Sequence, residues 1–252
     1  MYKRQHVINA AIESGINFLD TAESYGDGKS ESYMGTGLKG KRNDIFIATK
    51  FGFTSSNVEG KNRGSSENIR ISIEMSLRRL KTDWIDLYLL HRPDEDTPII
   101  ETMGTLEELV KEGKIRFYGC SYFTGEQMKN AADEAKKEGF IGFMTAQNAW
   151  NVLEREIEED LIPVCESENI TVLPYYPIAR GLLTGKYKRN TDAPTGSRLE
   201  GNSYLEEANF DIIEKLEQYA VDHGYDLLTL AISWLASQSV TASVIALSLI
   251  HI

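Results

Sequence analysis

Short apolar runs alternate with longer amphipathic stretches along most of the chain. The runs are rich in Ile, Leu, Phe and Val, which favours strands that are buried on both faces of a parallel sheet. Seven strands are predicted, at Asn17–Thr21, Asp44–Thr49, Ile85–Leu90, Ile115–Gly119, Phe143–Gln147, Thr171–Leu173 and Ala242–Ala246. This alternation is typical of repeated βα units.

The stretches between the strands carry apolar residues at helical spacing, and several end in Gly, which suits a left-handed helix C-cap. Helices are predicted over His6–Gly15, Ser65–Lys81, Pro98–Lys114, Thr124–Gly139, Ile157–Asn169, Tyr204–Gly224 and Asp226–Gln238. Seven strands with at least six intervening helices predict an α/β fold, an incomplete (β/α)8 TIM barrel. Because the chain opens inside a helix, the missing strand is the first, and the final helix is missing as well.

No linker rich in Pro, Gly or Ser divides the chain, and residues 189–203 are predicted as one long loop. A doubly wound open sheet is the structural alternative. Such a sheet carries a G-x-G-x-x-G phosphate-binding turn between a strand and a helix, and none is found between a predicted strand and helix here. The barrel is therefore the favoured architecture.

The amino-acid composition limits which classes of binding partner are expected. The chain has 252 residues, 26% of them charged, and a net charge of −11, so nucleic acid is not expected as a partner. No apolar run is long enough to cross a bilayer and no signal peptide precedes the first helix, so no membrane partner and a cytoplasmic location are expected. Cys120 and Cys165 are too few for a disulfide framework or a zinc ribbon and are expected to be buried thiols.

The two ends of the chain share an unusual relationship at the level of codons. The last six residues, LSLIHI, can be encoded by CTG TCT CTT ATA CAC ATC, and the first five, MYKRQ, by GTG TAT AAG AGA CAG. The second string lies within the reverse complement of the first, and it resembles a transposon end used to prepare sequencing libraries. We therefore expect residues 1–5 and 247–252 to be non-native and the barrel domain to span residues 6–246, an internal fragment.

Polar residues follow the ends of three predicted strands, where catalytic groups lie in such barrels. Asp20 and Lys50 close or follow the first two strands, Tyr25 lies in the loop after the first, and His91 follows the third. Taken singly, each has an ordinary structural explanation: Asp20 as a helix cap, Lys50 as a surface ammonium, His91 as a partner of a nearby backbone group. Taken together they form a coherent acid–base set.

A phenol with a pKa of about 10 is a poor proton donor near neutrality unless a neighbour stabilises its phenolate. An ammonium at Lys50 would do so, Asp20 would hold that ammonium, and neutral His91 would donate a hydrogen bond to a substrate oxygen. Such a site protonates an oxygen that is becoming an alkoxide. A carbonyl group reduced by hydride has this requirement.

Four motifs in order, GINFLDTAESYGDGKSE, IFIATKFG, DLYLLHRPD and LPYYPIARGLLTGKY, make the chain resemble the aldo-keto reductase superfamily over nearly the whole predicted native stretch. The resemblance implies a (β/α)8 barrel and a catalytic tetrad of Asp20, Tyr25, Lys50 and His91, with Tyr25 as the general acid. It implies NADPH bound across the barrel mouth, without a metal, and a small carbonyl compound as substrate. The oligomeric state is not implied.

The same resemblance implies further cofactor ligands. Ser121 and Gln147 correspond to residues that hold the nicotinamide carboxamide, and Tyr175 to the aromatic that stacks on the nicotinamide. Residues beside the pyrophosphate would be Pro177, Ile178, Gly181, Leu183, Gly185 and Lys186. From the residues alone, Ser121 is equally a turn hydroxyl, Gln147 a satisfied buried amide and Tyr175 a core aromatic.

The chain also departs from the family pattern. Tyr122 stands where the family commonly has Asn, which puts one carboxamide hydrogen bond in doubt. After SVIA the family continues with a segment that binds the adenosine 2′-phosphate, whereas here the sequence passes into LSLIHI, so NADP rather than NAD rests on resemblance alone. Without its first strand the barrel has open edges, and we expect this 252-residue chain to be unstable and to bind cofactor weakly.

Two other functions stay open. Relatives of this family bind nicotinamide cofactor and modulate a partner such as a potassium channel, so a sensor subunit is the second hypothesis. A metal-dependent lyase or isomerase is disfavoured, since the chain has only four His. The sequence does not identify the substrate, and residues 52–66 and 190–203 are candidate specificity loops. Phe51, Phe53 and Trp150 are candidates for an apolar wall; the alternatives are loop anchors for Phe51 and Phe53 and packing for Trp150. Arg92 and Asp94 are predicted to form a salt bridge at the rim.

Overall fold

The computed structural model describes residues 2–53 and 59–246. At its centre lies a sheet of six parallel strands in the order β1-β2-β3-β4-β5-β6, so that each strand pairs with the next one along the chain. The strands are β1 (Phe18–Asp20), β2 (Phe46–Phe51), β3 (Ile85–Leu90), β4 (Ile115–Ser121), β5 (Thr145–Gln147) and β6 (Thr171–Val172). Within the described residues, the other edge of β1 has no paired strand, so the predicted α/β fold and incomplete barrel are confirmed.

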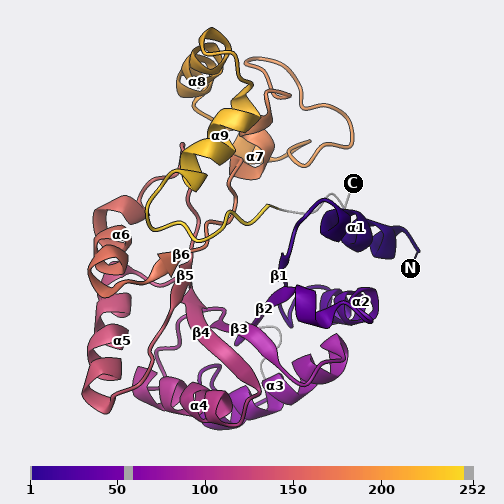
Figure 1. The fold of residues 1–252 in the computed structure, drawn as a ribbon. Coiled ribbons are helices and arrows are strands. Elements are labelled where there is room, and N and C mark those ends of the chain that lie inside the picture. Colours follow the sequence, from indigo (N-terminus) through magenta and orange to yellow (C-terminus); the bar gives the residue numbers. More distant parts are fainter. Residues whose placement is uncertain (1, 54–58, 247–252) are drawn as a thin grey trace.

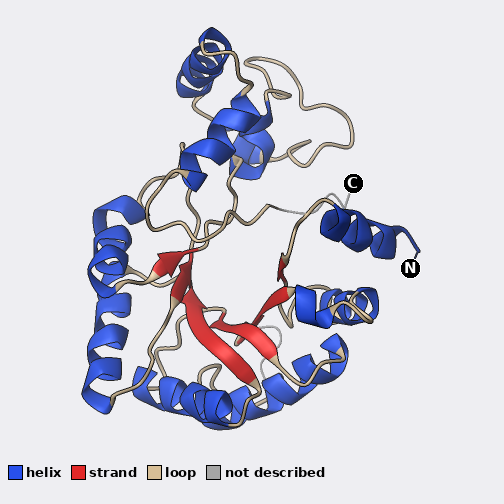
Figure 2. Ribbon diagram, viewed as in Figure 1, coloured by secondary structure: helices blue, strands red, loops and turns tan. Residues whose placement is uncertain are grey.

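The α-helices are α1 (Tyr2–Glu13), α2 (Lys29–Gly37), α3 (Ser66–Leu80), α4 (Ile99–Lys111), α5 (Gly125–Glu138), α6 (Ile157–Glu168), α7 (Ser203–Glu206), α8 (Phe210–Asp222) and α9 (Leu227–Ala236). Figures 1 and 2 show the sheet curving, with α2 to α6 along its outer side and α7 to α9 grouped beyond β6. Two 3-10 helices, η1 (Arg42–Asp44) and η2 (Ala179–Thr184), precede β2 and follow β6. The repeated βα order therefore brings the carboxyl ends of all six strands to one edge.

The predicted seventh strand, Ala242–Ala246, is wrong as a regular strand. Thr241 forms an isolated bridge with Val172, and the Ala242 amide donates to the Val172 carbonyl at 3.0 Å. The ladder stops at Pro174, because proline has no N–H to donate back to the adjacent segment. The Ile245 amide still donates to the Pro174 carbonyl (3.0 Å), so the segment lies beside β6 without forming a continuous strand.

Two helix predictions also change. The helix predicted over Tyr204–Gly224 is divided into α7 and α8, because the Asn209 side chain accepts from the Ile212 amide (3.3 Å) and starts a new helix. Helix α2 was not predicted, because its residues alternate between polar and small and give little apolar periodicity. It is held instead by buried Glu31, which pairs with Arg79 (2.6 Å) and accepts from Thr49 (2.6 Å).

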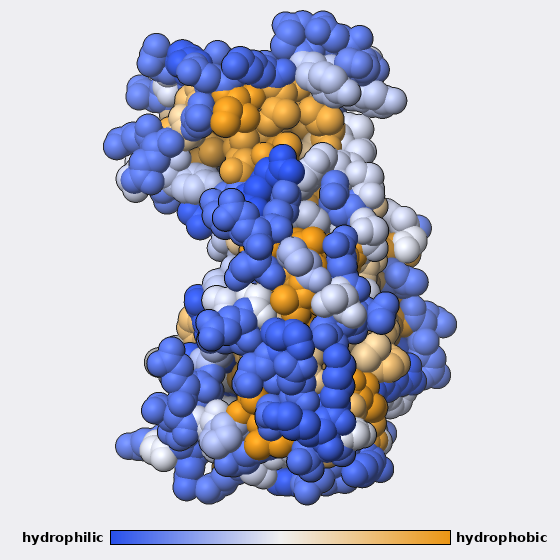
Figure 3. All heavy atoms as spheres, turned by 90° about the vertical axis from the view of Figure 1, so that its left-hand side faces the viewer, coloured by the Kyte–Doolittle hydropathy of each residue, from blue (hydrophilic) through white to orange (hydrophobic). Residues whose placement is uncertain are grey.

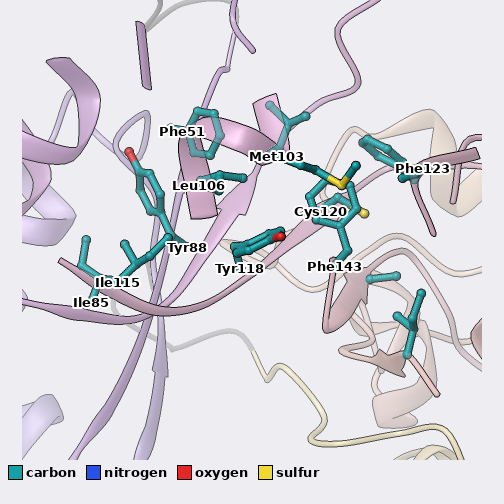
Figure 4. Packing of buried hydrophobic residues seen from close by; sticks show 14 of the residues in the cluster. Phe51, Ile85, Tyr88, Met103, Leu106, Ile115, Tyr118, Cys120, Phe123 and Phe143 are labelled. Atoms are coloured by element: carbon teal, nitrogen blue, oxygen red, sulfur yellow. The ribbon is translucent and has the colours of Figure 1, made fainter. Parts of the chain in front are cut away.

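Apolar packing occurs on both sides of the sheet. The main core lies between the sheet and its outer helices; Figure 4 shows its aromatic members from β2, β3 and β4 in contact with side chains of α4. A smaller cluster, Ala48, Leu87, Leu89 and Leu173, lines the inner face of the sheet. A third cluster joins η2 to α8 and α9, and Figure 3 shows apolar surface gathered on this upper part of the molecule.

Both cysteine thiols are buried, as predicted. In the described part of the chain no helix is long and apolar enough to cross a membrane. The six C-terminal residues predicted to be non-native lie outside the described residues, as do residues 54–58 of the first candidate specificity loop.

Candidate active site

The strand periodicity directs the predicted site residues to one face. Side chains two residues apart share a face of a strand, so Lys50 lies on the same face as Ala48, and His91 on the same face as Leu89. Ala48 and Leu89 belong to the cluster that lines the inner face of the sheet, and Asp20 is in register with Ala48. The inner face at the carboxyl ends of the strands therefore collects Asp20, Lys50 and His91.

Lys50 is a fully buried ammonium at the centre of this group. Its Nζ lies 2.7 Å from Asp20 Oδ2, 2.7 Å from the Thr21 carbonyl oxygen and 3.5 Å from the Tyr25 hydroxyl. Burial disfavours the charge, but the Asp20 carboxylate and the Tyr25 hydroxyl outweigh it, and the pKa of Lys50 is raised above its usual value. Lys50 therefore stays positively charged at neutral pH.

Tyr25 reaches the site from the turn between β1 and α2. Gly26, Asp27 and Gly28 follow it with positive φ angles, so the chain reverses sharply behind the tyrosine. The residue is 42% exposed, but its hydroxyl lies against buried Lys50. Burial raises the pKa of Tyr25 more than the Lys50 ammonium lowers it. The phenol is thus protonated at neutral pH and available as a proton donor beside a cation.

His91 completes the tetrad. Its amide donates to the Phe51 carbonyl (2.8 Å), and its ring makes an edge contact with the Tyr25 ring at 5.9 Å. Burial, with the positive charges of Lys50 and Arg92, lowers the pKa of His91 to about 3. The imidazole is therefore neutral at pH 7, and its Nδ1 has no hydrogen-bond partner within the described residues. The structure brings together all four residues predicted for the tetrad.

Two predicted carboxamide ligands lie beside this tetrad. The Gln147 side-chain amide donates from Nε2 to Asp20 Oδ1 at 2.8 Å, which ties β5 to β1 across the inner face. The Ser121 hydroxyl donates to the Gln147 carbonyl at 2.6 Å, and the two residues are in register on neighbouring strands. The Gln147 side chain is thus partly satisfied within the protein, through its Nε2.

The predicted nicotinamide and pyrophosphate residues follow β6. Tyr175 bridges to Ala149, and its ring lies 5.3 Å from the Tyr122 ring. The next predicted residues form the tight turn around η2: Pro177, Ile178, Gly181, Leu183, Gly185 and Lys186. The Gly181 amide donates to the Ile178 carbonyl (2.8 Å), and Leu183 is fully buried in the third apolar cluster. Their role toward a cofactor stays a prediction.

The predicted salt bridge at the rim is wrong. Arg92 and Asp94 do not form a salt bridge: Asp94 accepts hydrogen bonds from the Gly64 amide and the Thr97 hydroxyl, both at 2.7 Å. One backbone amide and one side-chain hydroxyl thus satisfy the carboxylate. The Arg92 guanidinium instead lies 3.5 Å from the centre of the Tyr122 ring. No local pattern indicates this stack, because Tyr122 lies in the loop after β4, 30 residues from Arg92 along the chain.

The predicted apolar wall is also only partly correct. Phe51 points to the outer face, where it is fully buried and stacks on Tyr88 at 4.7 Å between ring centres. Trp150 is buried too, and its indole N–H donates to Glu158 (2.9 Å), so it packs rather than facing substrate. Phe53 alone of the three lies at the site, with its ring 5.0 Å from the His91 ring.

Among the described residues, no group of three or more His, Cys, Asp or Glu side chains is arranged to hold a metal ion.

Comparison with known proteins places this arrangement in a family. A sequence profile of the aldo/keto reductase family matches residues 2–251. The chain is 37% identical over 239 residues to a probable aldo-keto reductase 1 of Glycine max, covering 92% of this chain and 67% of that protein. It is 34% identical to aldo-keto reductase yakc of Schizosaccharomyces pombe, which has NADP(+) in its name, covering 93% of this chain and 70% of that protein.

A further relative is a probable voltage-gated potassium channel subunit beta of Arabidopsis thaliana, 31% identical, with 95% of this chain and 76% of that protein covered. Among solved structures, the glycerol dehydrogenase AKR11B4 from Gluconobacter oxydans superposes with a TM-score of 0.81 at 34% identity, covering 95% of this chain and 74% of that chain. The fold, the profile and these relatives agree. The chain belongs to the aldo/keto reductase family.

Proposed function

We propose that this protein reduces aldehydes or ketones to alcohols with NADPH, and that Tyr25 gives the proton to the carbonyl oxygen. The observation that carries the proposal is the contact of Lys50 with both Asp20 and the Tyr25 hydroxyl, beside a neutral His91. A protonated phenol next to a buried cation is a donor whose conjugate base is stabilised at the moment of proton transfer.

The residues present fit a nicotinamide cofactor. Ser121 and Gln147 present polar groups at the inner face beside Asp20, and Gln147 Oε1, which takes no part in the bond to Asp20, would accept from a carboxamide N–H. Tyr175, at the end of the next strand, offers an aromatic face. The bound cofactor would supply the hydride. The name of the Schizosaccharomyces pombe relative supports NADP(H) over NAD(H).

The chain's own groups would act in a defined order. The carbonyl oxygen would lie between the Tyr25 hydroxyl and the His91 ring, because these two groups border the same inner face. Neutral His91 donates a hydrogen bond that polarises the carbonyl and orients it. Tyr25 then gives its hydroxyl proton to the oxygen as negative charge develops there, and Lys50 holds the resulting phenolate. Asp20 and the Thr21 carbonyl keep the Lys50 ammonium in place.

Tyr25→Phe tests the role of the phenol. We expect kcat for 4-nitrobenzaldehyde with NADPH to fall about 10²- to 10⁴-fold, because the general acid is removed while the aromatic ring stays. NADPH binding, followed by cofactor fluorescence with NADH in parallel, should persist. Tyr225→Phe is the matched control, since Tyr225 is 59% exposed and lies between α8 and α9. A variant Tyr25→Phe as active as wild type would exclude Tyr25 as the acid.

A second candidate function is a nicotinamide-binding regulatory subunit, supported by the relative named as a potassium channel subunit beta. The same assay separates the two. A sensor would oxidise bound NADPH slowly, with at most a single turnover, and wild type and Tyr25→Phe would be equally inert while both bind cofactor.

A further inference from the structure

Arg92 has no carboxylate partner among the described residues, a property that it shares with Arg78, Arg180 and Arg198, and through the Phe53 ring it lies beside His91. Others form ion pairs with Asp or Glu, namely Arg42, Arg70, Arg79, Arg116, Arg155 and Arg189. Arg92 has only ring contacts, although Asp94 is two residues away and is bound by the Gly64 amide and the Thr97 hydroxyl. In a chain of net charge −11, this is an uncompensated cation at the catalytic edge of the sheet.

Aromatic rings contact the Arg92 guanidinium and hold it in place. Its Cζ lies 3.5 Å from the Tyr122 ring centre and 5.8 Å from the Phe53 ring centre. Tyr122 has a φ of 62°, a conformation that a bulky residue adopts only when its surroundings require it. Its ring also contacts Tyr175 at 5.3 Å, which fixes it from the other side. A stacked guanidinium keeps its N–H donors free around its edge, where a planar anion can accept two of them.

This cation lies close to the reacting groups. The Phe53 ring that it contacts is 5.0 Å from the His91 ring, which in turn lies 5.9 Å from the Tyr25 ring. Its charge is one of the causes that lower the pKa of His91. A carbonyl bound between Tyr25 and His91 would therefore have the rest of its carbon chain beside Phe53 and within reach of Arg92.

We propose that Arg92 binds the carboxylate of an anionic carbonyl substrate, so that the preferred substrates are aldehydes or ketones that carry a carboxylate group beyond the reacting carbon. The proposal rests on the reductase function above and names its substrate class. Phe53 would cover the apolar part of the substrate, and Tyr122 would keep the guanidinium oriented. Arg92 is then a specificity-determining residue, not a proton donor.

The test compares two substrates that differ in charge at one end, 4-carboxybenzaldehyde and its methyl ester, methyl 4-formylbenzoate. With NADPH and the full chain, wild type should have the higher kcat/KM for the carboxylate. In Arg92→Gln the ratio of kcat/KM for the carboxylate to that for the ester should fall about 10- to 100-fold, the range of a charge-assisted hydrogen-bonded pair. Arg78→Gln removes the same charge from the exposed face of α3 and should leave the ratio unchanged.

If Arg92 has only a structural role, Arg92→Gln lowers kcat/KM for both substrates together and leaves their ratio unchanged. An unchanged ratio would overturn the proposal. Arg92→Lys keeps the charge but not the planar fork, and should retain part of the preference. If Arg92→Gln does not fold, the wild type decides the question: added NaCl must lower kcat/KM more for the carboxylate than for the ester. Turnover of neither aldehyde by wild type that is folded and binds NADPH would instead refute the reductase function itself.

Discussion

His91 is a titratable ring held neutral by its surroundings, and this has a cost at low pH. Its pKa is about 3 in the folded protein and about 6.5 in an unfolded chain. Below pH 6.5 the unfolded chain binds a proton that the folded protein refuses, so the stability contributed by neutral His91 is complete above pH 6.5 and is lost as the pH falls toward 3.

We expect the free energy of unfolding of wild type to fall by about 2 kcal/mol between pH 7 and pH 5 because of His91 alone. Urea titrations of wild type and His91→Gln at both pH values isolate this contribution, since the other titrating groups are common to both proteins. Equal losses in the two proteins would mean that the imidazole titrates normally in the folded state.

At the same scale, the position of a residue at the end of a strand was enough to predict which side chains the structure brings together at the inner face of the sheet. Asp20, Lys50 and His91 follow apolar strands in a regular βα order, and parallel pairing then brings them together. The sequence contains no comparable signal for side chains that pair with residues of another loop. Asp94 is used by loop amides rather than by Arg92, and Phe51 faces outward because it follows Lys50 by one residue.

Among the elements, α2 shows how close packing replaces apolar periodicity. A Cβ on Gly35 would lie 2.5 Å from the backbone of Arg79 and Leu80 in α3, so α2 approaches α3 only because this residue is glycine. By contrast, a Cβ on Gly104 in α4 would meet only the Phe140 ring, at 3.9 Å. Gly35 and Gly104 therefore form a matched pair for a substitution test, since both lie in helices but only Gly104 has room for a side chain.

Gly35→Ala should lower the free energy of unfolding by about 1–3 kcal/mol, because the backbone of α3 cannot move aside without cost. Gly104→Ala should raise it by up to about 1 kcal/mol, because alanine favours the helix and has room. Urea unfolding of both variants beside wild type measures the difference. Stabilisation by both substitutions would show that α2 is free to shift away from α3.

The elements that were predicted incorrectly depend on single residues that change the backbone through a local hydrogen bond or through a missing donor. Pro174 removes the donor that a seventh strand would need, and Asn209 starts a new helix inside an otherwise continuous apolar pattern. Strand β3 was predicted with its observed bounds, because it is fully buried on both faces and its apolar run ends where the burial ends. Periodicity is informative where burial is uniform and fails where one side chain decides the backbone.

At the scale of the whole molecule, apolar packing is divided between the main core around the sheet and the third cluster of η2, α8 and α9. We expect hydrogen exchange to show two levels of protection. Amides of β3, paired on both sides and buried, should exchange slowest, and those of α8 at least about 10-fold faster, because fewer buried contacts oppose their opening. Mass spectrometry of peptides from the two regions measures this, and equal protection would indicate one cooperative unit.

The alternation of strands and helices predicted this overall architecture, but not the separation of its cores. The third cluster is formed by residues from the turn after Tyr175 and from two helices more than 25 residues further on, and no local pattern announces such a contact.

The hydrogen bond from Gln147 to Asp20 joins residues 127 positions apart, whereas each strand pairs with the next one along the chain. Each pair of neighbouring strands closes only a short loop, so these pairs can assemble one after another. The bond from Gln147 to Asp20 can form only once all the strands from β1 to β5 are in place. In a partly assembled chain, Lys50 would thus face an Asp20 carboxylate that Gln147 does not yet hold in place. Recovery of catalytic activity on refolding should lag behind recovery of helix content, so that turnover reports the last step of assembly and not the first.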